Sequence, residues 1–160
     1  GTVAVKNVII WNAGDDAVDT DQSWGGTLDN FIVVNPGDEC FELDGPEGSM
    51  EAGHILKNGT VYAGIADGLV DLDDNSIVEM SGIYFFGMKA GQDFDLNPLA
   101  LTASDLQATL PDGGVVTDYF KAGSDAFVTT VALGANTVGA DVTKFSTWSW
   151  AAVSGALTDF

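Results

Sequence analysis

The densest set of groups able to do chemistry lies near the start of the chain, in the stretch AGDDAVDTDQSW (residues 13–24). It holds four aspartates, Asp15, Asp16, Asp19 and Asp21, within seven consecutive residues. Carboxylates spaced in this way can bind a hard cation, act as a catalytic acid pair, or form an acidic turn. Each interpretation requires different residues around the aspartates, so the rest of the sequence helps to choose between them.

The acidic stretch is one copy of a repeat. Its relatives are NVIIWNAGDDAVDTD (7–21), NFIVVNPGDECFELD (30–44), NGTVYAGIADGLVDLD (58–73) and, more loosely, SGIYFFGMKAGQDFDLN (81–97). The acid pairs begin at Asp19, Glu42, Asp71 and Asp95, which are 23, 29 and 24 residues apart. Runs of β-branched and aromatic residues separated by turn residues at this period predict a coil of strands.

The elements that position the acids alternate apolar and polar residues, which is the periodicity of a strand. We expect the apolar members of VDTD, FELD, VDLD and FDLN to point inward: Val18, Phe41, Val70 and Phe94, with Thr20, Leu43, Leu72 and Leu96. The second strand of each turn is VIIW, FIVV, TVY or IYFF. The predicted fold is therefore an all-β parallel β-helix, a solenoid with rungs of about 23–29 residues over residues 1–97.

The outward acids form two columns, Asp19, Glu42, Asp71 and Asp95 beside Asp21, Asp44, Asp73 and Asn97. Neighbouring rungs lie about 4.8 Å apart, where like charges repel by roughly 1 kcal/mol in water and several times more at a protein surface. Raised pKa values, lysines or bound cations relieve such repulsion. Oxygen ligands favour calcium, so the predicted metal site comprises Asp19, Asp21, Glu42, Asp44, Asp71, Asp73 and Asp95. A solvated face screened by salt is the alternative.

The same columns carry an enzymatic alternative. Glycosidases need two carboxyl groups about 5–9.5 Å apart, and adjacent rungs supply such spacings. The candidate catalytic pairs are Asp19 with Glu42, and Asp44 with Asp73. An EF-hand is excluded because DLDDNSIVE (71–79) lacks the required glycine.

Three further residue types have structural explanations. Asn7, Asn30 and Asn58, with Ser81 in the fourth copy, are expected to form a ladder of side-chain amides in a turn. Cys40 shares a repeat position with apolar residues, so we expect a buried small hydrophobe. His54 lies outside the repeat and is expected in a turn or at the surface.

Aromatic residues supply the candidate ligand platforms. Trp11 and Trp24 flank the first acidic cluster, and we expect Trp24 on an exposed turn where it can stack on a sugar. Residues 98–160 are expected to form the final irregular rungs and a C-terminal cap of the same domain. In that segment TASDLQATL (102–110) predicts a short helix, and Trp148 and Trp150 are expected to pack in the cap.

Charge restricts the partners. The chain has 24 acidic residues against five lysines and no arginine, a net charge of −19, which repels nucleic acid and anionic lipid and favours cations or neutral, hydroxyl-rich ligands. No apolar run approaches the roughly 20 residues of a membrane span. Strand sequence begins by Val3 with no N-terminal cap, so we expect a fragment of a longer chain, with upstream rungs or self-association at this edge.

The repeats NVIIWNAGDDAVDTDQSW and NFIVVNPGDECFELDGPEG and the ending ADVTKFSTWSWAAVSGAL resemble the C-terminal part of large secreted right-handed β-helix proteins of Bacteroidetes-type bacteria. The resemblance spans residues 3 to about 97 and the Trp-containing tail. It implies a right-handed solenoid and an exported or surface-attached protein of unassigned function. Pectate-lyase-like enzymes share the right-handed β-helix, but this chain has no arginine and no lysine in its acid-x-acid strands.

The leading functional hypothesis is a non-enzymatic extracellular surface or adhesion module that binds a glycan and is stabilised by divalent cations. The alternatives are a polysaccharide-active enzyme, a lyase or glycosidase using carboxylates of the solenoid face, and a structural segment of a surface fibre or layer.

Overall fold

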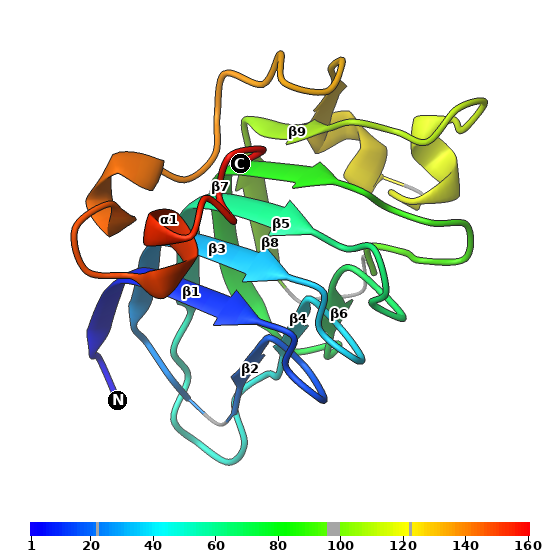
Figure 1. Ribbon diagram of the computed structural model, residues 1–160. Helices are drawn as coiled ribbons and strands as arrows, with labels where there is room; N and C mark the ends of the chain where they lie inside the picture. The colour runs from blue at the N-terminus through cyan, green and yellow to red at the C-terminus, as the bar shows by residue number, and fades with distance from the viewer. Residues whose placement is uncertain (22, 96–99, 122) are drawn as a thin grey trace.

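The backbone winds through two parallel sheets as a solenoid of about five turns (Figure 1). The computed structural model describes residues 1–21, 23–95, 100–121 and 123–160. The large sheet has the order β1 (Ala4–Trp11), β3 (Thr27–Val34), β5 (His54–Tyr62), β7 (Ile77–Phe86), β9 (Leu106–Ala108) and β10 (Val128–Thr130), with β8 (Ala100–Ser104) also paired to β7. The small sheet comprises β2 (Val18–Thr20), β4 (Phe41–Leu43) and β6 (Asp71–Leu72). The predicted parallel β-solenoid is confirmed.

The core lies between the two sheets and is filled by the apolar residues of each rung. Phenylalanine rings stack edge to face along the solenoid axis, with centroid distances of 5.7 Å for Phe31–Phe41, 6.3 Å for Phe41–Phe85 and 5.8 Å for Phe85–Phe120. The expected inward residues of the short strands are buried: Phe41, Val70, Phe94, Thr20, Leu43 and Leu72. Val18 is half-buried on the first rung, Leu96 lies outside the described residues, and Cys40 is buried as expected.

A column of left-handed residues bends β1, β3, β5 and β7 at the same place and continues between β8 and β9. Asn7, Asn30 and Asn58 have φ values of 57°, 61° and 58°, and the register continues the column to Gly82 and Asp105, with φ values of 63° and 54°. Asparagine, aspartate and glycine tolerate this backbone better than other residues. The fourth member is therefore Gly82, and the expectation of Ser81 is wrong because Ser81 pairs with Lys57.

The amide ladder is formed in part. The side chain of Asn30 donates to Asn7 Oδ1 over 2.7 Å, as expected for stacked amides. Asn58 instead donates to Asp29 Oδ1 over 2.7 Å. The column is thus defined by backbone conformation, and the amides of its members bond to different partners.

The predicted helix at 102–110 is wrong. This stretch forms the end of β8 and all of β9, with the left-handed Asp105 between them. Both strands pair with β7, and this non-local pairing outweighs a weak local helix propensity. Further along the chain, Val128–Thr130 forms β10 and pairs with β9.

Helical structure is short: η1 (Val116–Asp118), η2 (Ser124–Phe127), η3 (Val142–Phe145) and α1 (Trp150–Val153). Within the described ranges, no helix has the length and apolar character needed to cross a membrane.

Residues 131–160, which we call the C-terminal strap, run back over the outer face of the large sheet towards its first strands (Figure 1). Asp141 N donates to Asn30 Oδ1 over 2.6 Å, and Phe145, Ala151 and Leu157 form a second buried cluster with Ile32 and Val34. The expected location of the cap at the C-terminal end of the solenoid is therefore wrong. The strap covers the outer face of the large sheet. This face is apolar because β-branched and aromatic residues also fill the outward positions of the strands.

Candidate functional site

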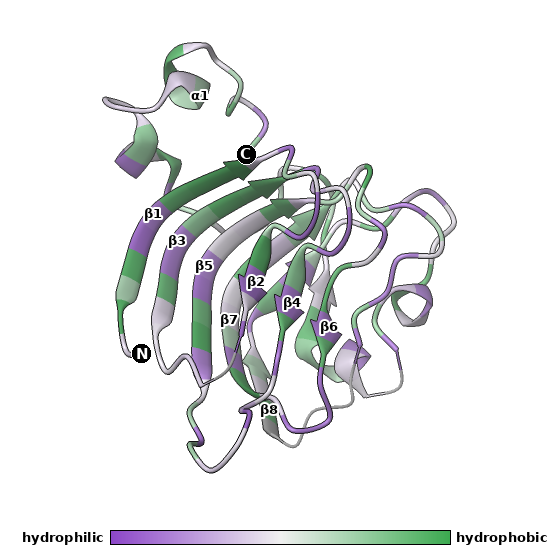
Figure 2. Cartoon of the chain, turned by 90° about the horizontal axis from the view of Figure 1, so that it is seen from below, coloured by the Kyte–Doolittle hydropathy of each residue, from purple (hydrophilic) through white to green (hydrophobic). Residues whose placement is uncertain are grey.

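The outward acids of the small sheet lie in register, as the repeat predicts. Asp19 pairs with Glu42 and Glu42 with Asp71, and the Val70–Phe94 bridge places Asp95 beside Asp71. Asp21, Asp44 and Asp73 follow the paired residues of the three strands and form the second column. We call these seven residues the acidic face; Asn97 lies outside the described residues. Figure 2 shows the hydrophilic positions side by side across β2, β4 and β6.

Two further acids, Asp16 and Glu39, belong to this site. The backbone N–H of Glu39 donates to Asp16 Oδ1 over 2.9 Å, and the side chain of Asp16 also hydrogen bonds with Glu42. The carboxylate of Glu39 lies over Gly68, where a side chain would collide with it. The repeated Gly-Asp-Asp and Gly-Asp-Glu turns, which place Asp16 and Glu39 at one repeat position, were the available signal.

Protons relieve part of the repulsion. Burial raises the pKa of Glu39 to about 7, and the charges of neighbouring acids add to this effect. The pKa of Glu42 is also raised to about 7. Burial is the largest cause, and the hydrogen bond with Asp16 and the charge of Asp16 add to it. The pKa values of Asp19 and Asp44 are raised in the same direction, first by burial and then by other carboxylates. Near neutral pH, Glu39 and Glu42 are therefore each partly protonated, so the surface carries both carboxylic acids, which donate protons, and carboxylates, which accept them.

Lysine contributes at the edge of this surface. Lys121 forms an ion pair with Asp93. The negative charge of Asp93 is one of those that raise the pKa of Glu39. The ion pair Lys6–Asp29 lies on the large sheet, and the ion pair Lys144–Asp141 of the strap lies beside it. Within the part of the chain that the structure describes, no three or more His, Cys, Asp or Glu side chains are grouped so as to hold a metal ion.

The predicted ligand platform Trp24 is half-buried, so the expectation of an exposed turn residue is wrong. Its ring stacks on His54, with centroids 5.9 Å apart and planes 24° from parallel. His54 is itself 1% exposed, which overturns its assignment to a turn or the surface. His54 Nδ1 lies 2.8 Å from the carbonyl oxygen of Trp24, and Nε2 lies 3.0 Å from that of Asp44. His54 thus links the loop after β2, which holds Trp24, to the loop after β4, which begins at Asp44.

The N-terminal end of the solenoid is a hollow with an apolar floor. Its lining includes Val5, Val8, Ile10, Val18 and Trp24, with Asp19 and Asp21 at the rim. In the described residues β1 pairs with β3 alone and β2 with β4 alone, so one edge of each strand faces outward here. The interior of the first rung is therefore partly open to solvent.

The other tryptophans lie outside the acidic face. Trp11 ends β1 on the outer face of the large sheet, 39% exposed, with its ring centroid 6.5 Å from that of Phe160. Trp148 and Trp150 are 60% and 75% exposed, but the ring of Trp148 lies against buried Phe145 with centroids 5.9 Å apart, so the expected packing is wrong for Trp150. Both lie beside Asn7, Val8 and Ile9 of β1. Trp11 and Trp24, the two predicted ligand residues, are therefore on different sides of the large sheet.

Comparison with known proteins adds no relative: the chain matches no protein-family model, no curated protein and no solved structure. What the site can do is therefore argued from its geometry. The paired carboxyl groups can hydrogen bond to hydroxyl groups, attract cations, or exchange protons.

Proposed function

We propose that this chain is a non-enzymatic extracellular surface or adhesion module whose acidic face binds a neutral glycan and is stabilised by divalent cations. The observation that supports this most is the outward register of Asp19, Glu42 and Asp71 across three strands. The resemblance to C-terminal parts of secreted Bacteroidetes-type β-helix proteins supports an extracellular or outer-surface location and a right-handed coil.

Partly protonated carboxyl groups suit a hydroxyl-rich ligand. A carboxylate only accepts hydrogen bonds, whereas a carboxylic acid also donates one, and sugar hydroxyls do both. Glu42, with its pKa raised to about 7, offers both forms near neutral pH. The net charge of −19 favours neutral glycans over anionic ones.

Binding to this face is tested with a glycan array of neutral oligosaccharides. We expect wild-type protein to bind a subset and Glu42→Gln and Asp19→Asn to weaken that binding. Glu51→Gln, on an exposed loop, is the matched control. Equal binding by all four proteins would remove the acidic face from the proposal.

The cation component is tested by thermal unfolding in calcium and in chelator. At free calcium about ten times Kd, a site on the folded protein adds about 1.4 kcal/mol to the free energy of unfolding, or about 3–6 °C in Tm. Because calcium competes with protons for the carboxyl groups, we expect a larger rise at pH 8 than at pH 5.5. An unchanged Tm in millimolar calcium at pH 8 contradicts cation stabilisation.

A polysaccharide-active enzyme is the second candidate, and the hydrogen-bonded pair Asp16 and Glu42 favours it. One carboxyl with its pKa raised to about 7 beside a second carboxylate resembles an acid–base arrangement. If wild type releases sugars from a polysaccharide and Glu42→Gln and Asp16→Asn do not, this candidate replaces the binding module.

The N-terminal hollow favours a third component, association. We propose that this end receives further rungs, supplied by upstream chain or by a second copy, as in a structural segment of a fibre or layer. The outward edges of β1 and β2 offer backbone groups for strand addition. Trp148 and Trp150 lie beside β1 and add exposed apolar surface.

A further inference from the structure

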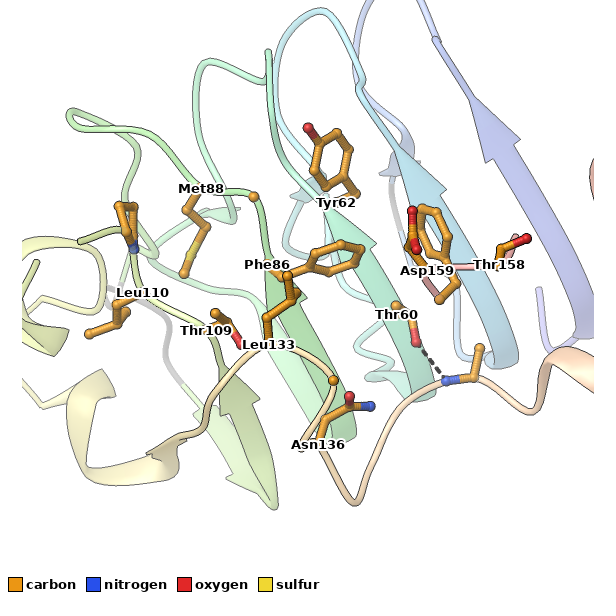
Figure 3. A pocket seen from close by; sticks show the side chains of 15 residues that line it. Thr60, Tyr62, Phe86, Met88, Thr109, Leu110, Leu133, Asn136, Thr158 and Asp159 are labelled. Carbon is orange, nitrogen blue, oxygen red and sulfur yellow. Dashed lines mark hydrogen bonds between the residues drawn. The ribbon is translucent and has the colours of Figure 1, made fainter. Parts of the chain in front are cut away.

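A second concave surface lies on the opposite side of the large sheet from the acidic face, between strands β5, β7 and β9 and the C-terminal strap (Figure 3). The cleft has a volume of about 760 Å³, within the roughly 300–1,000 Å³ of small-molecule sites. Tyr62 and Phe86 come from the sheet, and Leu133, Asn136 and Phe160 come from the strap.

Phe86 is the centre of an aromatic group in this cleft. Tyr84 stacks on it with centroids 5.3 Å apart and planes 4° from parallel, Tyr62 lies at 5.1 Å, and Phe160 meets it edge to face at 5.3 Å. These contacts fix the ring orientations before any ligand arrives. Trp11, predicted from sequence to be a ligand platform, extends the group through its contact with Phe160.

The walls of the cleft are held in place by hydrogen bonds between sheet and strap. Gln107 exchanges two of them with Thr137, over 2.8 Å and 2.7 Å, and Thr60 Oγ1 accepts from Ala140 N over 2.8 Å. A site that exists before binding loses less entropy when it is occupied. The cleft is thus preorganised rather than formed by a loop closing over a ligand.

Polar groups surround the aromatic floor. Asn136 Nδ2 donates to Val138 O over 2.7 Å, which orients the amide at the strap side. Figure 3 shows Asn136, Thr158 and Asp159 around the aromatic rings. Aromatic faces bind the C–H face of a pyranose, while amide, hydroxyl and carboxylate groups bind its hydroxyls. The carboxylate of Asp159 and the net charge of −19 oppose anionic ligands.

We propose that this cleft is a binding site for a neutral pyranose of an oligosaccharide, with the half-buried rings of Tyr62 and Phe160 as platforms and Asn136 and Asp159 as hydroxyl partners. Phe86, 5% exposed, supports both rings from beneath. The inference shares the ligand class of the proposed function but does not require the acidic face to bind a glycan.

The experiment uses isothermal titration with cellopentaose, laminaripentaose, xylopentaose and maltopentaose, and with an oligogalacturonate as the anionic comparison. Leu133 is 68% exposed at the cleft rim, so Leu133→Trp blocks the cleft without disturbing the core. Val153→Trp changes an equally exposed strap residue outside the cleft. Asn136→Ala removes a hydroxyl partner, and Glu42→Gln reports on the acidic face.

We expect at least one neutral pentasaccharide to bind, with affinity reduced about tenfold or more by Leu133→Trp, about tenfold by Asn136→Ala, and unchanged by Val153→Trp. Aromatic proton shifts of Tyr62 and Phe160 on titration locate the ligand. No binding by any neutral probe, tighter binding of oligogalacturonate, or binding indifferent to both cleft variants overturns the proposal. Loss in Glu42→Gln with no change in Leu133→Trp assigns glycan binding to the acidic face and also overturns it.

Discussion

Ionisation of Glu39 is unfavourable in the folded protein, because the residue is partly buried among other acids. Its carboxylate lies in a turn, over Gly68, with Asp38, Asp71 and Asp93 nearby. In the unfolded chain the pKa of a glutamate is near 4.5, whereas in the folded protein that of Glu39 is about 7. The folded state therefore binds protons more tightly than the unfolded state between these two values.

This shift predicts how stability depends on pH. The free energy of unfolding falls as pH rises from about 4.5 to about 7, because ionisation of Glu39 and Glu42 is less favourable in the folded protein. We expect Glu39→Gln to remove part of this dependence and to unfold at a higher temperature than wild type at pH 8. Thermal unfolding from pH 5 to pH 8 measures it, with Glu51→Gln as control. A Tm for Glu39→Gln at or below that of wild type at pH 8 contradicts the assignment.

Individual residues were predictable where the repeat determines them. The alternation of Asp19, Glu42 and Asp71 placed them outward in register, and the structure agrees. His54 was not predictable in this way. Its hydrogen-bond partners are the carbonyl oxygens of Trp24 and Asp44 and the hydroxyl of Thr20, thirty, ten and 34 residues away, so no local pattern marks it as buried.

At the scale of the strand, the left-handed column explains why asparagine recurs. Asn30 has φ 61°, is 8% exposed, and bonds both to Asn7 and to the strap at Asp141. It therefore has a backbone role, which glycine can also fill, and a side-chain role, which glycine cannot.

Two substitutions separate these roles. Both substitutions lose the side-chain bonds. Asn30→Gly also removes the β-carbon that strains the left-handed backbone, whereas Asn30→Ala keeps it, so Asn30→Ala should be about 1–2 kcal/mol less stable than Asn30→Gly. We therefore expect wild type to be most stable, followed by Asn30→Gly and then Asn30→Ala, in urea unfolding. If alanine is tolerated as well as glycine, the backbone strain is absent.

Element type was predictable for the rungs but not for residues 102–110. Long β-branched runs such as FIVV form strands in any sheet context. TASDLQATL has a helix-like composition, and its strands exist because β7 offers an edge for pairing. The signal available was Asp105, an aspartate at the position that asparagine holds in the first three copies.

The strap acts on the whole molecule, because it covers an apolar face that the solenoid leaves outside its core. Phe145 is the fully buried side chain of this contact, packed with Ile32 and Val34. Sequence analysis placed this segment at the end of the solenoid, since every repeat protein needs a cap. It could not show that outward positions of the large sheet are apolar as well.

Phe145→Ala tests that contact. We expect a loss of about 3–5 kcal/mol in the free energy of unfolding, as for other buried aromatic residues. Trp150→Ala, at an exposed strap position, should change it by no more than about 0.5 kcal/mol. Denaturant unfolding compares the two. Similar losses for both variants would place Trp150 in a packed environment.

The open N-terminal end predicts association of the isolated chain. Val5 lies in the hollow on β1, and Val5→Lys places a charge there that opposes strand addition. We expect wild type to form larger species with rising concentration in sedimentation velocity, and Val5→Lys to stay monomeric. Ile65→Lys, at an exposed turn, is the control. A wild type that is monomeric at all concentrations contradicts this prediction.

The return of the strap to the first strands has a consequence during biosynthesis. The contact between Asn30 and Asp141 spans 111 residues of chain. At about 5–20 residues per second, the ribosome makes the partner on the order of ten seconds after β3. For that interval the growing polypeptide carries Ile32 and Val34 uncovered, so chaperones have a defined window and surface at which to act.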